Sequence, residues 1–194
     1  MKLPREFYER ETMDVAKDLL GKCLVHETAE GTVKGIIVEV EAYIGPNDAA
    51  AHTYKGLRSS RTEVAFGPGG FAYVYLIYGM YNCFNIVTNK AEKPEVVLIR
   101  ALEPIEGIPI MIERRCTDKL KNLCSGPGKL CSAMAITRAD NGVDLCKDSL
   151  YLLDAPPISE DQIQATPRIN IDYALEAKNY PWRFIIKSNK FVSK

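Results

Sequence analysis

The sequence predicts an α+β fold: a single domain, residues 1–194, with a mostly antiparallel, curved β-sheet flanked by helices and a protruding β-hairpin. Three observations lead to this prediction. Runs rich in β-branched and aromatic residues alternate with short turns, which is typical of antiparallel strands. Helix-like patterns are few and short. The length suits one domain with its own hydrophobic core.

The N-terminal part of the chain predicts one helix and one pair of strands. Residues 13–20 follow a threonine that can cap a helix, and they precede a glycine that can end it. Residues 23–26 and 33–43 are strand-like, and the turn AEGT between them indicates a hairpin. Residues 48–52 can form a single helical turn. Residues 53–70 are polar, basic and glycine-rich, which indicates a loop.

A second hairpin is predicted from residues 71–77 and 82–88, which are rich in aromatic and β-branched side chains. The intervening residues Tyr78-Gly79-Met80-Tyr81 put large apolar side chains at its tip. Water penalises exposed apolar area of this kind. We therefore expect the tip to insert into another apolar stack.

The rest of the chain predicts three strands and two helices. Residues 96–102 are an apolar run typical of a buried strand. Residues 104–115 are expected to be helical, and residues 126–136 open with Gly-Pro-Gly-Lys, which can begin a helix. Two further strands are predicted at residues 169–171 and 183–186. Strands paired with near neighbours and helices kept apart from them define the α+β class.

Composition excludes several classes of protein. The chain is 46% hydrophobic and 26% charged with a net charge of zero, so no overall field attracts it to nucleic acid or membrane. No apolar run approaches the roughly 20 residues of a membrane span. The N-terminus lacks the apolar core of a signal peptide. These features predict an intracellular monomer without membrane contact, in the cytoplasm or nucleoid of a bacterium or the nucleus of a eukaryote.

The cysteine and histidine content indicates neither a metal site nor a cofactor. The six cysteines include no Cys-x-x-Cys pair and no closely spaced set of four, and only two histidines are present. We expect these cysteines to be small buried apolar residues rather than disulfides or ligands. They are Cys23, Cys83, Cys116, Cys124, Cys131 and Cys146.

The stretch GIIVEVEAYIGPNDAAAH, which begins at Gly35, places two acids inside an apolar strand. Because side chains alternate between the faces of a strand, Glu39, Glu41 and Tyr43 should share one face with Ile37. One interpretation is a half-exposed strand with two solvated acids. The other is a carboxylate held in a cleft beside an aromatic platform.

Two other stretches favour the cleft. FAYVYLIYGMYNCFN contains four tyrosines within nine positions, and Tyr73 and Tyr75 share a face by strand alternation. Buried tyrosines need a partner for each hydroxyl, so such a cluster suggests stacking surfaces as well as an aromatic core. The stretch VVLIRALEP puts Arg100 at the end of an apolar strand. A buried arginine must be paired, and Glu41 is the expected partner.

These stretches together resemble the alkyladenine DNA glycosylase family, also called 3-methyladenine DNA glycosylases. LLGKCLVH, LCSGPGKLCSAMAI, PRINIDYA and WRFIIK match it too, in the order of the family and over nearly the whole chain. The resemblance implies a monofunctional base-excision repair enzyme that needs no cofactor. It would flip a damaged purine out of duplex DNA and hydrolyse the N-glycosidic bond. The implied lesions are 3-methyladenine, 7-methylguanine, hypoxanthine and ethenoadenine.

The resemblance also implies residue roles for the chemical step. Glu41 matches the acid that activates the attacking water, and Arg100 matches the arginine that shares this water. Ile169 matches the residue whose backbone carbonyl completes the water site. Arg100 should keep Glu41 ionised at neutral pH. Glu39 is the second choice for the acid.

Further matches concern the base and the duplex. Tyr43 and Tyr75 match the aromatic rings that sandwich the flipped base, with His52 as the third wall and a hydrogen-bond donor. Asn85 matches the residue that excludes the amino group of guanine. The residues implied to contact DNA are Tyr78, which would intercalate, Met80, Tyr81, Lys129 and Arg168. Arg58 and Arg61 are additional candidates for phosphate contacts.

Other functions remain open on the sequence. A non-enzymatic nucleic-acid-binding module of the same fold predicts binding without base release, and it leaves Glu41 and Arg100 unexplained. A nucleosidase acting on free nucleosides would not need an apolar hairpin tip. A helix–hairpin–helix glycosylase does not fit, because the candidate acid comes early and on a strand.

Overall fold

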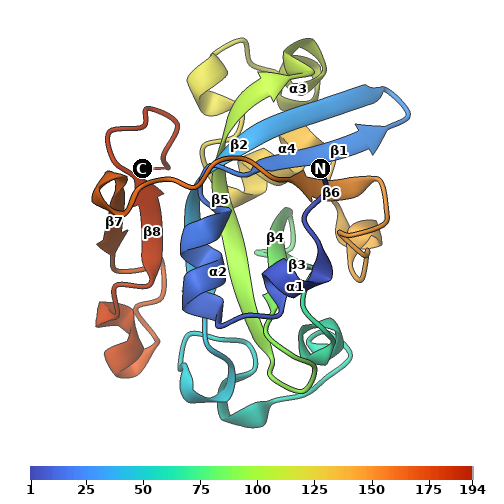
Figure 1. Cartoon of the computed structure of the whole chain (residues 1–194). Helices are drawn as coiled ribbons and strands as arrows, with labels where there is room; N and C mark the ends of the chain where they lie inside the picture. Colours follow the sequence, from blue (N-terminus) through green and yellow to red (C-terminus); the bar gives the residue numbers. More distant parts are fainter. Residues whose placement is uncertain (194) are drawn as a thin grey trace.

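A computed structural model describes residues 1–193, so Lys194, the last residue of the predicted domain, lies outside the described residues. Its centre is a curled antiparallel sheet with the strand order β3-β4-β5-β2-β1-β6, as Figure 1 shows. β8 pairs with β2, and β7 pairs with β8. The strands are β1 (Cys23–Thr28), β2 (Gly31–Tyr43), β3 (Ala72–Ile77), β4 (Tyr81–Thr88), β5 (Glu95–Glu106), β6 (Leu150–Leu153), β7 (Ile163–Thr166) and β8 (Arg183–Ile186). The predicted α+β class with a curved, mostly antiparallel sheet is confirmed.

Few helices cover this sheet. The α-helices are α1 (Arg5–Tyr8), α2 (Thr12–Leu19), α3 (Ile108–Arg115) and α4 (Pro127–Met134). α2 packs on β2 and β5, while α4 packs on β4 and β5 and against α3. α2 buries Val15, Ala16 and Leu19, which recur at helical spacing and so form one apolar stripe. Short 3-10 helices occupy Gly45–Asn47, Tyr54–Gly56, Glu63–Phe66, Leu120–Asn122, Arg138–Asp140, Glu160–Gln162 and Leu175–Asn179.

The register between β2 and β5 is irregular where the two candidate acids lie. Ile37 is opposite Leu102 and Glu39 is opposite Ala101, so Val38 is an extra residue on β2. The next pair skips Arg100, which is thus an extra residue on β5. Such bulges redirect side chains and are frequent next to active sites. They also explain why strict alternation was wrong for Ile37, which lies in the main core rather than with Glu39 and Glu41.

The β3–β4 hairpin protrudes with an apolar tip, as predicted. Tyr78 (φ 53°) and Gly79 (φ 70°) are both left-handed, and Met80 N–H donates to Ile77 O at 3.2 Å. This is a tight turn of the kind that fits the twist of paired strands. Tyr78, Met80 and Tyr81 are 75%, 66% and 52% exposed. Three large side chains therefore stand in water at one end of the molecule.

Several predicted elements differ from the structure. Residues 169–171 form a bend rather than a strand. β6 and β7, with the sequences LYLL and IQAT, were not predicted because they hold few aromatic and β-branched residues. Residues 104–106 continue β5 instead of beginning the helix. Residues 48–52 form turns without a helix.

The prediction of buried cysteines holds for only part of the set. Cys83, Cys124 and Cys131 are buried, but Cys116 is exposed and the other two are partly exposed. Among the described residues all six thiols are free. No helix within residues 1–193 is long and apolar enough to cross a membrane.

Candidate active site

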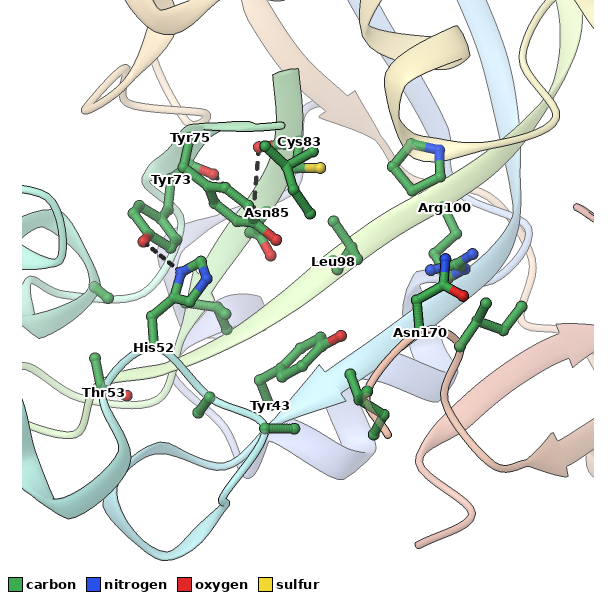
Figure 2. Close-up of a pocket in the computed structure, with 18 of the residues that line it drawn as sticks. Tyr43, His52, Thr53, Tyr73, Tyr75, Cys83, Asn85, Leu98, Arg100 and Asn170 are labelled. Carbon is green, nitrogen blue, oxygen red and sulfur yellow. Dashed lines mark hydrogen bonds between the residues drawn. The ribbon is translucent and has the colours of Figure 1, made fainter. Parts of the chain in front are cut away.

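A cavity of about 250 Å³ lies where β2, β3, β4 and β5 meet the segment 169–173 (Figure 2). Its lining includes six of the residues that were predicted to form the pocket. These are Tyr43 on β2, Tyr75 on β3, Asn85 on β4, Arg100 on β5, and His52 and Ile169 in loops. Tyr43 and Tyr75 approach the cavity from different sides in Figure 2. The fold thus assembles at one place residues that are far apart in the sequence.

Glu41 lies directly behind the wall of this cavity. Its side chain is fully buried, and three cavity-lining residues contact it. Tyr43 Oη donates to Glu41 Oε2 at 2.8 Å, and Arg100 Nη1 lies 3.3 Å from the same oxygen. The backbone N–H of Ile169 donates to Glu41 Oε1 at 2.8 Å. Glu41 therefore touches the residues that line the cavity but does not itself line it.

Ile169 makes a contact that the sequence did not predict, and the role of its carbonyl in a water site stays a prediction. The sequence-based expectation was a backbone carbonyl that completes a water site, whereas the structure places the Ile169 N–H on the carboxylate. Asn170, which follows, has φ 60°, and this left-handed residue turns the chain at the cavity. The amide therefore helps to hold Glu41, because a hydrogen bond from N–H favours the charged carboxylate.

Arg100 is shared between two acids. Sequence reasoning paired Arg100 with Glu41, and the two side chains do lie within ion-pair distance. Arg100 also donates a hydrogen bond from Nε to Glu39 Oε1 at 2.9 Å. Burial opposes the charge of Arg100, yet the adjacent Glu41 and Glu39 carboxylates more than offset this and raise the pKa of Arg100. Glu39 is fully buried, does not line the cavity and has four protein donors, so it is poorly placed to act on water.

Arg168 is buried and paired inside the protein, which corrects its assignment as a DNA contact. Its side chain is fully buried and forms a two-pronged ion pair with Asp48, with Nη1–Oδ2 at 2.5 Å and Nη2–Oδ1 at 2.8 Å. It also donates to the carbonyls of Ala42 and Ala177. No phosphate can reach a guanidinium enclosed in this way. Asp48 was missed because an acid after a Gly-Pro turn looks like any loop residue.

The Arg168 guanidinium also supports the Tyr43 ring. Its Cζ lies 4.7 Å from the ring centroid, and Arg168 does not line the cavity. Burial and the adjacent Glu41 charge raise the pKa of Tyr43 well above its usual value, so its hydroxyl stays protonated and can donate. A cation on one face reduces the attraction of the ring for a second cation on the other. A cationic group on the other face of the Tyr43 ring should therefore be attracted less strongly than by a ring without this arginine.

His52 is fixed by two neighbouring side chains. Its Nδ1 lies 3.0 Å from Tyr73 Oη, and its ring meets Tyr75 edge-on at 4.5 Å between centroids. Arg61 Nη2 is 3.5 Å from Nε2. Burial, with a smaller effect of the Arg61 charge, lowers the pKa of His52 from 6.5 to about 4. The imidazole is therefore neutral at pH 7 and can donate one hydrogen bond, but it is not an imidazolium acid.

We expect His52 to titrate near pH 4 in the folded protein. Below pH 6.5 the unfolded chain binds a proton that folded His52 does not accept until about pH 4, so this group lowers the free energy of unfolding as the pH falls through that window. NMR of the two histidine rings measures the midpoint, and His52→Gln identifies its signal. A midpoint near 6.5 would contradict the expectation.

Asn85 is fully hydrogen-bonded through its amide nitrogen. Nδ2 donates to Tyr73 O at 3.1 Å and to Cys83 O at 3.4 Å, the second of which Figure 2 marks. The side chain is buried and rigidly held against the cavity. Tyr73, a cavity residue that the sequence analysis did not assign to the base, shares its face with Tyr75 and orients both His52 and Asn85.

The predicted DNA-contacting residues are placed differently from one another. Tyr78 and Tyr81 line the cavity from the hairpin, whereas Met80 is exposed at the tip and does not line it. Tyr81 packs on Gly128 at the start of α4, where a Cβ would lie 3.0 Å from its ring, so a larger residue there would have to push the ring aside slightly. Lys129 is exposed in the next position. Arg58 is engaged by Glu63 and Glu92 on the surface, which reduces its availability for phosphate.

Comparison with known proteins identifies the family. The family described as "Methylpurine-DNA glycosylase (MPG)" matches residues 6–190. The chain belongs to the methylpurine-DNA glycosylase family. Full-length relatives named "Putative 3-methyladenine DNA glycosylase" include those of Clostridium acetobutylicum (55% identical over 100% of this chain and 98% of the relative), Bacillus cereus strain G9842 (54%, 100% of both) and Alkaliphilus oremlandii (52%, 100% of both).

Membership of the methylpurine-DNA glycosylase family confirms two predictions. The resemblance noted in the sequence was correct, and the protein is a DNA glycosylase, a hydrolase of N-glycosyl bonds that acts on DNA. The alternative of a binding module without activity loses its support. Within residues 1–193 no group of three or more His, Cys, Asp or Glu side chains is arranged to hold a metal ion.

Proposed function

We propose that this protein is a monofunctional glycosylase that flips a damaged purine out of duplex DNA and releases it with a water activated by Glu41. The observation that carries the proposal is the buried Glu41 carboxylate behind a cavity wall formed by Tyr43, Arg100 and Ile169. A buried charge is costly unless it is paired. A buried carboxylate at the back of a cavity, such as that of Glu41, therefore favours a chemical role.

The proposed reaction replaces the bond between C1′ and the purine nitrogen with a bond between C1′ and water oxygen. As the base leaves with the bonding electrons, the sugar gains oxocarbenium character, which a nearby carboxylate stabilises. Glu41 accepts a proton from the attacking water. A cationic lesion such as 3-methyladenine or 7-methylguanine leaves as a neutral base, whereas a neutral lesion such as hypoxanthine or ethenoadenine leaves as an anion and takes up a proton from solvent. Positioned general bases contribute roughly 10²–10⁴-fold to such rates. Arg100 shares the water and keeps the carboxylate in place.

The target base must leave the stack before this can happen. Extrusion costs a few kcal/mol, and least for damaged or mispaired bases. Tyr78, which is exposed at the hairpin tip and also borders the cavity, is suited to fill the vacated stack. Its left-handed backbone in a tight turn directs the ring outward. Met80 and Tyr81 would extend this apolar wedge, and Lys129 would contact a phosphate.

Base selection follows from the shape of the cavity. Tyr43 and Tyr75 offer aromatic faces, and each stacked base gains roughly 1–3 kcal/mol. Asn85 cannot swing aside without losing two buried hydrogen bonds, so it should slow the release of a purine carrying the guanine amino group, 7-methylguanine included. Candidate substrates are 3-methyladenine, 7-methylguanine, hypoxanthine and ethenoadenine. Among residues 1–193 no lysine lines the cavity, which favours simple hydrolysis over Schiff-base strand cleavage.

Base release from defined duplexes tests this function. We expect free base from duplexes with a single ethenoadenine or hypoxanthine and from alkylated DNA, none from the matched undamaged duplex, and strand breaks only after alkali. The protein should act as a monomer, which sedimentation during the assay can verify. Binding to lesion duplexes without release of any base would refute the proposal and favour a damage-binding role.

A further inference from the structure

The arginine that holds Glu41 is itself held by a second buried acid. Arg100 donates through Nε to Glu39 Oε1 at 2.9 Å, and its Nη1 reaches Glu41 Oε2 at 3.3 Å. A guanidinium is a rigid planar fork, so fixing Nε fixes the directions in which both Nη groups point. Glu39 therefore decides which nitrogen of Arg100 faces Glu41 and which faces the cavity.

Glu39 is fixed in turn from its other side. Ser193 donates from its backbone N–H to Oε2 at 2.6 Å and from Oγ to Oε1 at 2.8 Å, and Arg183 Nε donates to Oε1 at 2.7 Å. Phe191 packs on Val38, the extra residue of the bulge. Segment 191–193 thus closes the back of the site, although it is 150 residues away in the sequence from the strand it supports.

We infer that Glu39 and Ser193 are positioning residues of the glycosylase reaction, which orient Arg100 toward Glu41 Oε2 so that Oε1, which accepts from the Ile169 N–H, keeps a second lone pair for water. This inference rests on the proposed function of Glu41. Glu39 itself has little capacity left to bind water, because its two oxygens accept four hydrogen bonds from protein. It acts on the reaction through Arg100.

The charges of the cluster support the same role. Two carboxylates, Glu39 and Glu41, face two guanidiniums, Arg100 and Arg183, so the buried group is neutral. If Glu39 loses its charge, both cations are left with Glu41 alone. Arg100 should then rotate onto Glu41 and occupy the oxygen that would receive the water proton. The excess positive charge would also oppose the developing oxocarbenium ion.

The test compares three single variants and one double variant, which combines Glu39→Gln with Ser193→Ala. Glu39→Gln removes the charge with little change in volume, and Ser193→Ala removes one donor. Glu103→Gln is the matched control, because Glu103 accepts from Asn189 of the same C-terminal segment at 3.1 Å but does not touch Arg100. Single-turnover release of ethenoadenine gives the rate. The Kd for a duplex with a hydrolysis-resistant 2′-fluoro lesion gives binding, and thermal unfolding confirms that every variant is folded.

We expect Glu39→Gln to slow base release by about 10–10²-fold, the effect of a small misplacement of catalytic groups, with Kd within about twofold of wild type. Ser193→Ala should lower the rate less. The double variant should be no slower than Glu39→Gln, since both residues act through one arginine. Glu103→Gln should match wild type in rate.

Two results would overturn the inference. One is a Glu39→Gln rate within twofold of Glu103→Gln, and the other is a loss in the double variant that equals the product of the single losses. Absence of base release by the wild-type protein is a separate outcome, because it would refute the proposed function from which the inference starts.

Discussion

Glu41→Gln should reduce single-turnover release of ethenoadenine by about 10³-fold, because an amide cannot accept the water proton. Affinity for the lesion duplex should change little, since Glu41 is fully buried and does not line the cavity. Tyr43 and Ile169 can still donate to the amide oxygen. Base-release kinetics, together with Kd for the same duplex, measure the two effects separately.

Glu106→Gln is a suitable control for this variant. Glu106 is a surface carboxylate at the far end of β5, paired with Lys34 at 2.7 Å. Its loss should leave both rate and affinity unchanged. Residual activity of Glu41→Gln within tenfold of wild type would rule out Glu41 as the general base.

Asp48→Asn should lower the free energy of unfolding by about 3–5 kcal/mol, because it leaves the Arg168 charge buried without a counter-charge. Asp48 also accepts from the backbone N–H groups of Ile44 and Ala50, at 3.1 and 3.0 Å. An asparagine cannot satisfy both groups and two guanidinium nitrogens at once, since one of its two side-chain atoms is a donor. Urea unfolding of the two proteins measures the difference.

The control for Asp48→Asn is an ion pair in water. Glu63→Gln breaks the exposed pair between Glu63 and Arg58, at 2.7 Å, and should change the free energy of unfolding far less than Asp48→Asn, because water solvates both groups. Equal effects of the two substitutions would show that Arg168 is solvated. That result would restore its assignment as a phosphate contact.

Local sequence patterns were sufficient for much of the fold. Strands and turns depend on side-chain branching, alternation and turn residues within a few positions, so β1 to β5, the apolar hairpin tip and β8 could be predicted. β6 and β7 were missed although they are no shorter than β8, because β8 (RFII) is rich in aromatic and β-branched residues, whereas β6 (LYLL) is mostly leucine and β7 (IQAT) is half polar. The strand predicted at 169–171 was wrong because its apolar residues serve the cavity loop instead of a sheet.

The candidate site was predicted by residue type and family resemblance, and its geometry was not. The sequence indicated that Glu41, Tyr43, His52, Tyr75, Asn85 and Arg100 belong together, and all but Glu41 line the cavity. It did not indicate the double bulge, since alternation holds only while strands stay in register. Nor did it show that Arg168 is buried rather than exposed at the surface, since burial depends on neighbours distant in the chain.

The sequence by itself determined the family, the strand–turn framework and the set of chemical groups available to the site. Tertiary structure alone decided that Glu39 has its oxygens occupied by protein hydrogen bonds and that Glu41 adjoins the cavity. Glu39 meets Ser193 and Arg168 meets Asp48 across separations of 154 and 120 residues. Such pairs are set by the packing of the whole sheet and its C-terminal strands. A buried charge takes its role from the partners that packing brings to it.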